Sequence, residues 1–222
     1  MGNARSRHIG MTIEAFETAG VRGFLHRPLV PHGDAVALTH GAGSNANAPL
    51  LVRMASAFAE AGFVVLRYDL PYRMARATGP PSPATSAQDR EGIVRAIDAL
   101  RKISAGRVFA GGHSYGGRQT AMAAAEHAEL ASALLLFSYP LHPPRKRDQL
   151  RTGFFPDLRT PALFIHGTRD PFGSIEELRA AIAAIPARTD LLAIEGAGHE
   201  LASAPAPAIL ARFRALVCYP EK

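Results

Sequence analysis

Hydrophobic positions along the chain alternate between two kinds of segment. Short, continuous runs of β-branched and other apolar residues are separated by longer, Ala-rich segments. Continuous apolar runs are typical of strands buried on both faces, and their alternation with longer segments is typical of βαβ units. The pattern therefore predicts a mostly parallel sheet, with buried strands at residues 35–39, 63–68, 107–110, 133–137, 162–165 and 191–194.

The beginning of the chain follows a different pattern. Residues 11–16 alternate apolar and polar side chains, and a second short run follows Ala19-Gly20 at residues 21–25. This predicts an antiparallel hairpin ahead of the parallel strands. Helices are predicted at about residues 47–61, 87–103, 174–185 and 205–217, and one more runs from the segment after residue 110 to about residue 127. The prediction is an α/β fold with eight strands in one domain over residues 1–222, with residues 1–10 as a flexible leader.

Two stretches break this alternation. Residues 70–88 are rich in Pro, Gly and Ser, and residues 139–160 join two strands without a strongly periodic helix. Both are predicted to be irregular connections. Each leaves the carboxyl end of a strand, where open α/β sheets bind ligands, so either could cover a site.

A serine surrounded by glycines follows one of the buried strands. Residues 111–117 read GGHSYGG, and Gly112 to Gly116 fit the pattern G-x-S-x-G. This pattern at a strand-to-helix turn holds a serine in a strained conformation with its Oγ exposed. The alternative is a phosphate-binding glycine loop, but no Lys-Ser, Lys-Thr or G-x-G-x-x-G accompanies it. We therefore predict that Ser114 is a nucleophile.

A serine nucleophile needs a base, and the base needs a carboxylate to orient it. In this architecture the acid comes next in the chain and the histidine last. Asp170 follows the strand predicted at 162–165, and His199 follows the strand predicted at 191–194. The predicted triad is Ser114, Asp170 and His199. Asp69, which precedes the serine in the chain, is expected to form an ion pair with Arg67 or Arg73 instead.

The tetrahedral intermediate needs backbone N–H donors for its oxyanion. His40-Gly41-Ala42-Gly43 directly follows an earlier predicted strand. The N–H of Ala42 and the N–H of Tyr115, at the start of a helix, are predicted to form this oxyanion hole. The alternative for the loop is an ordinary glycine turn before the next helix.

Other side chains near the predicted strand ends are candidates for substrate contact or for loop packing. His40 and His166 precede glycines and are expected to support loops by hydrogen bonding, whereas His113 is expected to point away from the nucleophile. The residues proposed to contact substrate, with loop packing as the alternative, are His142, Tyr72, Tyr139 and Phe172.

The composition bears on whether the chain binds nucleic acid or a membrane, and on its location. The net charge is +6, but the basic residues are scattered, and their densest group, Arg145-Lys146-Arg147, has no interleaved aromatic residues. A nucleic-acid partner is therefore not expected. No apolar run is long enough to span a bilayer, and no membrane association is expected. The single cysteine, Cys218, cannot form an intramolecular disulfide and is predicted to pack in the apolar C-terminal stretch, and a cytoplasmic location is expected.

Several segments together resemble a known family. They are THGAGSN, LRYDLPY, GGHSYGGR, SYPLHPP, FIHGTRD and GAGH, spaced from Thr39 to His199. The series is similar to small α/β hydrolases of the dienelactone-hydrolase-like group. It is most similar to a subfamily shared with a testis-expressed protein and a subunit of the non-specific-lethal acetyltransferase complex. The resemblance implies a sheet with an antiparallel second strand, no cap domain, and Ser114, Asp170 and His199 as the triad.

The residues and the resemblance together predict a serine hydrolase that uses neither cofactor nor metal. Its substrate would be a small carboxylic ester or thioester, cleaved through an acyl-enzyme on Ser114. Two alternatives stay open. The chain could be a non-catalytic interaction module that keeps the fold, since fold does not determine function. The same triad could also serve an acyltransferase or a peptidase.

Overall fold

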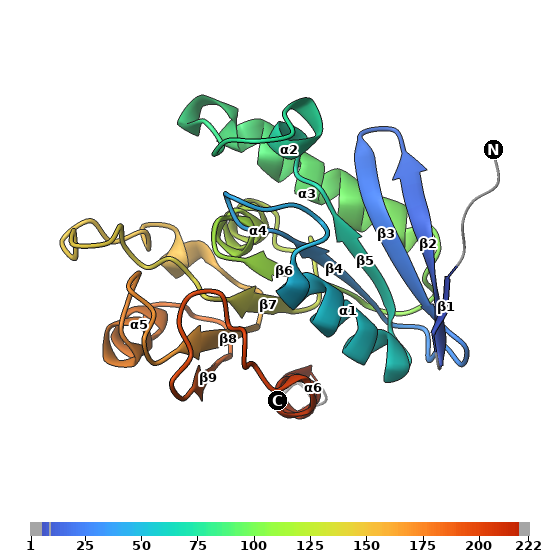
Figure 1. Cartoon of the computed structure of the whole chain (residues 1–222). Coiled ribbons are helices and arrows are strands. Elements are labelled where there is room, and N and C mark those ends of the chain that lie inside the picture. The colour runs from blue at the N-terminus through green and yellow to red at the C-terminus, as the bar shows by residue number, and fades with distance from the viewer. Residues whose placement is uncertain (1–5, 9, 218–222) are drawn as a thin grey trace.

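The computed structural model describes residues 6–8 and 10–217 and contains a nine-stranded sheet with helices on both faces (Figure 1). The strand order across the sheet is β1-β2-β3-β5-β4-β6-β7-β8-β9. All pairs from β5 to β9 are parallel, whereas β3 is antiparallel to both of its neighbours. The strands are β1 (Ser6–His8), β2 (Met11–Thr18), β3 (Val21–Pro28), β4 (Ala35–Thr39), β5 (Val64–Tyr68), β6 (Val108–His113), β7 (Leu134–Phe137), β8 (Ala162–Gly167) and β9 (Thr189–Ile194).

The eight predicted strands correspond to β2–β9, which confirms the predicted mostly parallel sheet. The additional strand β1 lies within the predicted flexible leader, and pairs antiparallel with β2 through Ser6↔Ile13 and His8↔Met11. That part of the leader prediction is wrong, because a three-residue edge strand carries no periodic signal. Cys218, predicted to pack in the C-terminal stretch, lies outside the described residues, as do residues 1–5 and 9.

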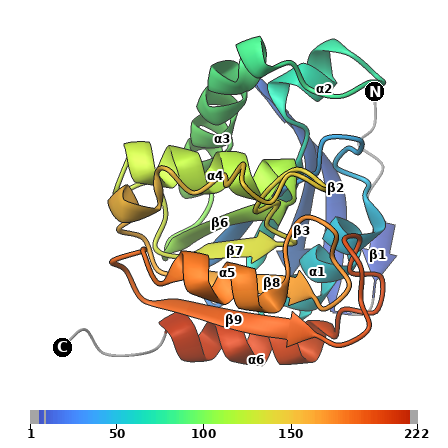
Figure 2. The ribbon, with the colours of Figure 1, turned by 90° about the vertical axis from the view of Figure 1, so that its left-hand side faces the viewer.

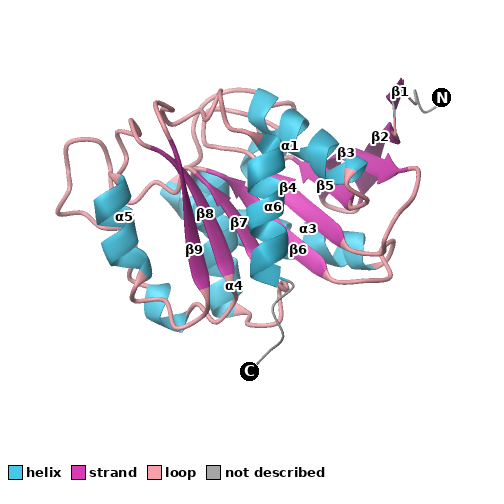
Figure 3. Cartoon of the chain, turned by 90° about the horizontal axis from the view of Figure 1, so that it is seen from below, coloured by secondary structure: helices cyan, strands magenta, loops and turns pink. Residues whose placement is uncertain are grey.

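Two layers of helices cover the sheet (Figures 2 and 3). Helices α1 (Pro49–Glu60) and α6 (Ala206–Val217) contribute to one buried apolar cluster. Helices α3 (Ser86–Arg101), α4 (Tyr115–Glu126) and α5 (Ile175–Ile182) contribute to the other. Apolar residues at helical spacing, such as Ile93, Ala96, Ile97 and Leu100 on α3, form the buried stripe that each helix presents to the sheet.

The two predicted irregular connections contain short ordered elements. Residues 70–88 hold the helix α2 (Pro71–Ala75) and the 3₁₀ turn η1 (Pro83–Thr85). Residues 139–160 hold the 3₁₀ turn η2 (Phe155–Asp157). Pro71 fits the first turn of α2 because a helix start leaves its N–H groups unpaired and Pro has none to lose. A helix of five residues has little more than one turn, so its apolar residues do not repeat often enough to predict it.

At the centre of the sheet, the helices that follow two neighbouring strands lie on opposite faces. β4 leads into α1 on one face, whereas its neighbour β6 leads into α4 on the other face. The carboxyl ends of these two strands therefore flank a crevice of the kind in which open α/β sheets bind ligands. The loop after β4 begins with His40-Gly41, and the turn after β6 is Ser114.

Candidate active site

Ser114 forms the turn between β6 and α4. Its backbone has φ 51° and ψ −116°, a conformation that residues with a Cβ rarely adopt. The N–H of Ser114 donates to the carbonyl of Phe137 on β7 at 2.8 Å, and its own carbonyl accepts from the N–H of Arg118 at 2.9 Å. The turn is thus held from the sheet and from the helix, as expected for the strained turn that the G-x-S-x-G pattern predicts.

Close backbone approach explains the glycines around this serine. A Cβ on Gly116 would lie 2.4 Å from the carbonyl oxygen of His40, and one on Gly112 would lie 2.8 Å from that of Thr39. Both distances are far below a carbon–oxygen contact. The glycines therefore let the end of β4, the end of β6 and the start of α4 meet at one point.

The structure brings the three residues of the predicted triad into one hydrogen-bonded chain. Nε2 of His199 lies 2.8 Å from Oγ of Ser114, and Nδ1 of His199 lies 2.8 Å from Oδ2 of Asp170. The residues come from the turns that follow β6, β8 and β9. With a proton on Nδ1, His199 donates to Asp170 and accepts from the hydroxyl of Ser114. This is the arrangement in which an imidazole can act as a base towards a serine.

The carboxylate of Asp170 is buried but well supplied with donors. Oδ1 accepts the N–H of Phe172 at 2.9 Å, and Oδ2 accepts from His199. Burial alone would raise the pKa of Asp170, but the bonds from His199 and Phe172, together with the nearby His166, hold it below its usual value. His166, as expected, supports the loop, because its Nε2 donates to the carbonyl of Gly173 at 2.8 Å. Asp170 is therefore ionised at neutral pH.

Two side chains that the sequence did not identify hold the backbone of His199. Nε2 of His113 donates to the carbonyl of His199 at 2.8 Å, and Oγ of Ser138 donates to the same oxygen at 2.6 Å. The expectation that His113 points away from the nucleophile did not include this role at His199, whose ring centre lies 5.1 Å from that of His113. No sequence spacing links residues 113 and 138 to residue 199, because the three meet only through the strand order.

The loop after β4 is held by side chains that reach it from α2. Nε of Arg73 donates to the carbonyl of Ser44 at 2.7 Å, and Oη of Tyr72 donates to the carbonyls of Gly41 and Ala42 at 3.1 and 2.9 Å. His40, as expected, also supports the loop, because its Nδ1 donates to the carbonyl of Gly41 at 2.9 Å. These contacts fix the orientation of the peptide groups on either side of Ala42.

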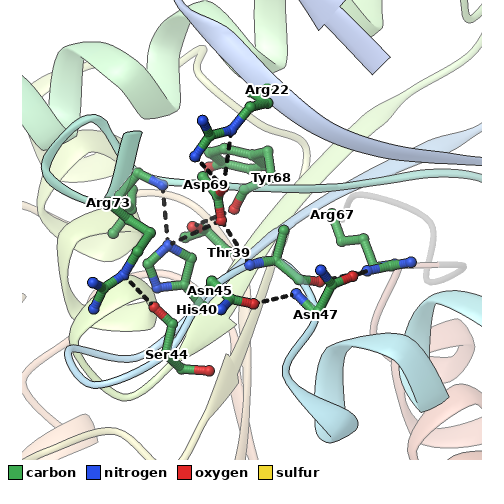
Figure 4. A network of polar contacts seen from close by, with 12 residues as sticks. Arg22, Thr39, His40, Ser44, Asn45, Asn47, Arg67, Tyr68, Asp69 and Arg73 are labelled. Carbon is green, nitrogen blue, oxygen red and sulfur yellow. Dashed lines mark hydrogen bonds and ion pairs between the residues drawn. The ribbon is translucent and has the colours of Figure 1, made fainter. Parts of the chain in front are cut away.

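A second group of contacts holds the far end of this loop (Figure 4). Oδ1 of Asp69 accepts the N–H of Ala46 at 2.8 Å, while Oδ2 pairs with Arg22 at 2.8 Å. Asp69 therefore forms an ion pair, as expected, but its partner is Arg22 and not Arg67 or Arg73. Arg67 instead donates to the carbonyl of Ala46 at 2.6 Å. Burial lowers the pKa of Arg67 to about 10, although Asp69 opposes this shift.

The buried carboxylate of Asp89 on α3 connects the two parts of the predicted oxyanion hole. Oδ2 accepts from the hydroxyl of Tyr115 at 2.7 Å, and Oδ1 accepts from the N–H of Tyr72 at 3.0 Å. Tyr72 in turn donates to the carbonyl of Ala42. Burial raises the pKa of Asp89, and the bonds from Tyr115 and Tyr72 oppose that shift. Tyr115 is the first residue of α4, so its own N–H has no partner within the helix.

Three of the four residues proposed to contact substrate have buried side chains that bond to loop backbone. Tyr72, Tyr139 and His142 are at most 4% exposed. Tyr139 packs against Phe155 and donates its hydroxyl to the carbonyl of Arg151, and Nδ1 of His142 donates to the carbonyl of Pro143. The structure thus favours loop packing, the alternative, for these three. Phe172 differs, because it is only partly buried and its ring centre lies 4.3 Å from that of His199.

A hollow of about 330 Å³ lies beside Tyr115 and Ala42. Its wall is formed by the start of α4 and by the segment around η1. The lining residues are Ala42, Pro80, Pro81, Ser82, Pro83, Ser86, Tyr115, Arg118, Gln119 and Met122. Residues 80–83 thus flank the candidate site, as proposed for the connection 70–88. Among the described residues, no group of three or more His, Cys, Asp and Glu side chains is placed to hold a metal ion.

Comparison with known proteins identifies the family. Residues 32–206 match the model of an alpha/beta hydrolase domain. The chain belongs to the α/β-hydrolase family. This α/β hydrolase is similar in fold to dienelactone hydrolase from Anabaena variabilis, with 21% identity over 96% of this chain and 94% of that one, and a TM-score of 0.66.

Two further solved structures share the fold of this α/β hydrolase. One is Est1E from Butyrivibrio proteoclasticus with bound ferulic acid, with 17% identity over 97% of this chain and 100% of that one, and a TM-score of 0.71. The other is an acetyl xylan esterase from Paenibacillus sp. R4, with 15% identity over 99% and 88% of the two chains, and a TM-score of 0.68. The dienelactone-hydrolase-like fold expected from the sequence is thereby confirmed.

Proposed function

We propose that this α/β hydrolase is a serine hydrolase that cleaves small carboxylic esters or thioesters. The observation that carries the proposal is the hydrogen-bonded chain from Oγ of Ser114 through His199 to Asp170, with 2.8 Å at both contacts. A serine held in a strained turn and bonded to an imidazole that is itself bonded to a carboxylate is the arrangement that activates a hydroxyl. The names of solved structures with this fold, which include an acetyl xylan esterase and two lipolytic enzymes, support the same class of substrate.

In the proposed mechanism, Nε2 of His199 takes the proton of Ser114 as Oγ forms a bond to the ester carbonyl carbon. The carbonyl oxygen becomes an oxyanion and accepts hydrogen bonds from the N–H groups of Ala42 and Tyr115. When the carbonyl re-forms, the bond to the leaving group breaks and His199 gives its proton to the departing alkoxide or thiolate. A water molecule, deprotonated by His199, then attacks the acyl-enzyme, and the acid is released as Ser114 regains its proton.

Asp170 keeps the imidazole oriented throughout these steps. Its carboxylate accepts from Nδ1 of His199, which places Nε2 towards Ser114 and stabilises the imidazolium that forms when the serine proton is taken. The bonds from His113 and Ser138 to the carbonyl of His199 fix the backbone that carries the ring. Both supports act through His199 and do not touch the reacting atoms.

A fluorophosphonate probe and an ester panel test the proposal together. We expect the probe to label the wild type and not Ser114→Ala, and acyl esters of graded chain length to be hydrolysed by the wild type alone. A preference among these esters would measure the size of the acyl pocket. Absence of labelling and of turnover in a folded wild type would contradict the proposal and favour a non-catalytic interaction module. Transfer of the acyl group to an added amine or alcohol would favour an acyltransferase.

We propose a cytoplasmic location, supported by the presence of a single cysteine. In the described part of the chain, no helix has both the length and the apolar character needed to cross a membrane. We also propose that the chain is a relative of the subfamily shared with the testis-expressed protein and the non-specific-lethal complex subunit, supported by the segments GGHSYGGR, SYPLHPP and HGTRD.

A further inference from the structure

The hollow beside the proposed oxyanion hole contains one cationic side chain, that of Arg118. Arg118 is the fourth residue of α4 and lines the hollow together with Ala42 and Tyr115. Tyr115 and Arg118 are three residues apart on this helix, so their side chains lie on neighbouring positions of one face. Nε of Arg118 is buried and has no hydrogen-bond partner. A buried guanidinium donor without an acceptor is costly, which calls for a chemical reason.

Other buried or partly buried arginines of the chain are paired within the protein. Arg90 contacts Glu126, and Arg67 and Arg73 donate to backbone carbonyls of the loop after β4. For Arg118, by contrast, no ion pair with a carboxylate is found within residues 10–217. The hollow itself is lined by no acidic residue. Arg118 therefore lines a space that holds no carboxylate from the protein, and its buried Nε has no acceptor.

A second arginine, Arg151, does not line the hollow but is close enough to Arg118 to interact with its charge. Arg151 is partly buried, and its backbone carbonyl accepts the hydroxyl of Tyr139. Burial lowers the pKa of Arg151, and the positive charge of Arg118 lowers it further. Two arginines that repel one another in a partly desolvated position are stabilised when an anion binds between or beside them.

We propose that this hollow binds an anionic group, a carboxylate or a phosphate, on the ester substrate, and that Arg118 is the residue that recognises it. This inference rests on the proposed function, because it places the ester carbonyl at the N–H groups of Ala42 and Tyr115. Because Ala42, Tyr115 and Arg118 line the same hollow of about 330 Å³, the anionic group and the scissile carbonyl belong to one small molecule. The substrate is thus a short ester that carries a negative charge, and a guanidinium suits such a group because it can donate two parallel hydrogen bonds.

Matched pairs of esters that differ only in charge test this inference. For charge on the leaving group, 3-carboxyphenyl acetate and 3-phosphonophenyl acetate are compared with 3-carbamoylphenyl acetate. For charge on the acyl group, methyl hydrogen succinate is compared with methyl succinamate. We expect wild type to prefer the charged member of at least one pair by about tenfold or more in kcat/KM. The better of the carboxylate and the phosphonate identifies the anion.

The variants assign this preference to Arg118. We expect Arg118→Gln to lower the ratio of charged to uncharged kcat/KM by about 10- to 100-fold, and Arg118→Lys to retain part of it because the charge remains. The control is Arg95→Gln, which removes an exposed arginine paired with Glu91 on α3 and should keep the wild-type ratio. An equal ratio in wild type and Arg118→Gln would overturn the inference.

A binding measurement separates this inference from the proposed function. Calorimetric titration of 3-hydroxybenzoate, 3-hydroxyphenylphosphonate and succinate, which are products of the charged esters, into Ser114→Ala requires no turnover. We expect the double variant Ser114→Ala/Arg118→Gln to bind at least one of them about tenfold more weakly or worse. Equal binding by the two proteins overturns the anion site. Failure of fluorophosphonate labelling would instead contradict the hydrolase proposal alone.

Discussion

The two sides of the proposed active site are built differently. On one side, Asp170 and His199 lie in the loops after β8 and β9, and backbone hydrogen bonds from Thr168 to Ile194 and from Arg169 to Ala197 join these two loops. On the other side, Ala42 lies in the loop after β4, which side chains of α2 and α3 hold through Tyr72 and Asp89. The first side inherits its geometry from the sheet, whereas the second depends on a buried polar network formed by segments that are distant in the sequence.

This difference predicts which substitutions change the geometry of the site. Neighbouring parallel strands fix the ends of β6, β8 and β9 by their ladders of backbone hydrogen bonds. The end of β4 is fixed by the same kind of ladder, but in the loop that follows it the carbonyls of Ala42 and Ser44 accept from side chains of α2. Substitutions on the strand side should therefore remove chemistry without changing the fold, and substitutions in the network should change the geometry of the oxyanion hole.

The largest effect is expected from the serine itself. Ser114→Ala removes the nucleophile and leaves the turn between β6 and α4 in place, so we expect turnover to fall by about 10⁴-fold or more while the thermal transition stays cooperative. Ester hydrolysis and circular dichroism measure the two quantities. Substantial activity in the variant would show that another residue is the nucleophile.

The network side should show a smaller loss of activity. Asp89→Ala leaves the hydroxyl of Tyr115 and the N–H of Tyr72 without their acceptor, so we expect kcat to fall by about 10- to 100-fold through misplacement of the oxyanion donors. Steady-state kinetics should show a larger change in kcat than in KM. Asp89→Asn keeps one acceptor oxygen and should lie closer to wild type.

A matched control on the same helix is Asp98→Ala. Asp98 is exposed on α3 and pairs with Arg101. Because an exposed pair of this kind contributes little, its loss should leave kcat unchanged. If Asp98→Ala and Asp89→Ala reduce kcat equally, the network around Asp89 does not orient the donors of the oxyanion hole. The loop after β4 would then not depend on that network.

The point where the two sides meet can be tested through stability. Gly116→Ala would place a Cβ 2.4 Å from the carbonyl oxygen of His40. A helix favours Ala over Gly by up to about 1 kcal/mol, but a backbone oxygen at this distance cannot move without shifting β4. We expect a net loss of about 1–3 kcal/mol in the free energy of unfolding, measured by urea denaturation.

Gly153→Ala is the control for this substitution. A Cβ on Gly153 would meet no atom within 4 Å, and its backbone does not require glycine. The free energy of unfolding should stay within about 0.5 kcal/mol of wild type or rise slightly. A Gly116→Ala variant as stable as Gly153→Ala would mean that β4 and α4 can separate at little cost.

The strand side of the site could be predicted from the sequence because each of its residues directly follows a recognisable strand. A G-x-S-x-G turn after an apolar run, then an acid and a histidine after later runs, follow from strand order alone, and Ser114, Asp170 and His199 indeed lie within hydrogen-bonding distance. The network side could not be predicted in this way. The sequence around Tyr72 leaves both substrate contact and loop packing open, and Asp89 has no motif around it.

The network side could not be predicted because its contacts join elements that are far apart in the sequence. Asp89 meets Tyr115 only because α3 and α4 pack side by side on one face of the sheet, and His113 meets His199 only because β6 and β9 end at the same rim. A single sequence gives the positions of these elements along the chain. It does not give the rotation of each helix about its axis, which decides which polar side chain is buried towards which neighbour.

The last expected effect concerns the pH dependence of stability and involves both sides of the site. Burial lowers the pKa of His40 beside the oxyanion loop, and of His113 and His166 beside His199 and Asp170. These imidazoles stay neutral in the folded protein, whereas in the unfolded chain they bind protons near pH 6.5. The unfolded form therefore binds more protons as pH falls from about 7, and the stability of the folded form declines.

Asp89 acts with the opposite sign. Burial raises its pKa, so the folded form keeps a proton that the unfolded chain has lost, and its contribution falls as pH rises above about 4. Each proton changes the slope by at most about 1.4 kcal/mol per pH unit, so three histidines outweigh one carboxylate. We expect urea denaturation to show a lower free energy of unfolding at pH 5.5 than at pH 7.5, with a steeper decline in Asp89→Asn. A free energy of unfolding that does not change across this range would mean that these histidines have the same pKa in the folded and unfolded chains. Water would then reach the imidazoles on both sides of the site.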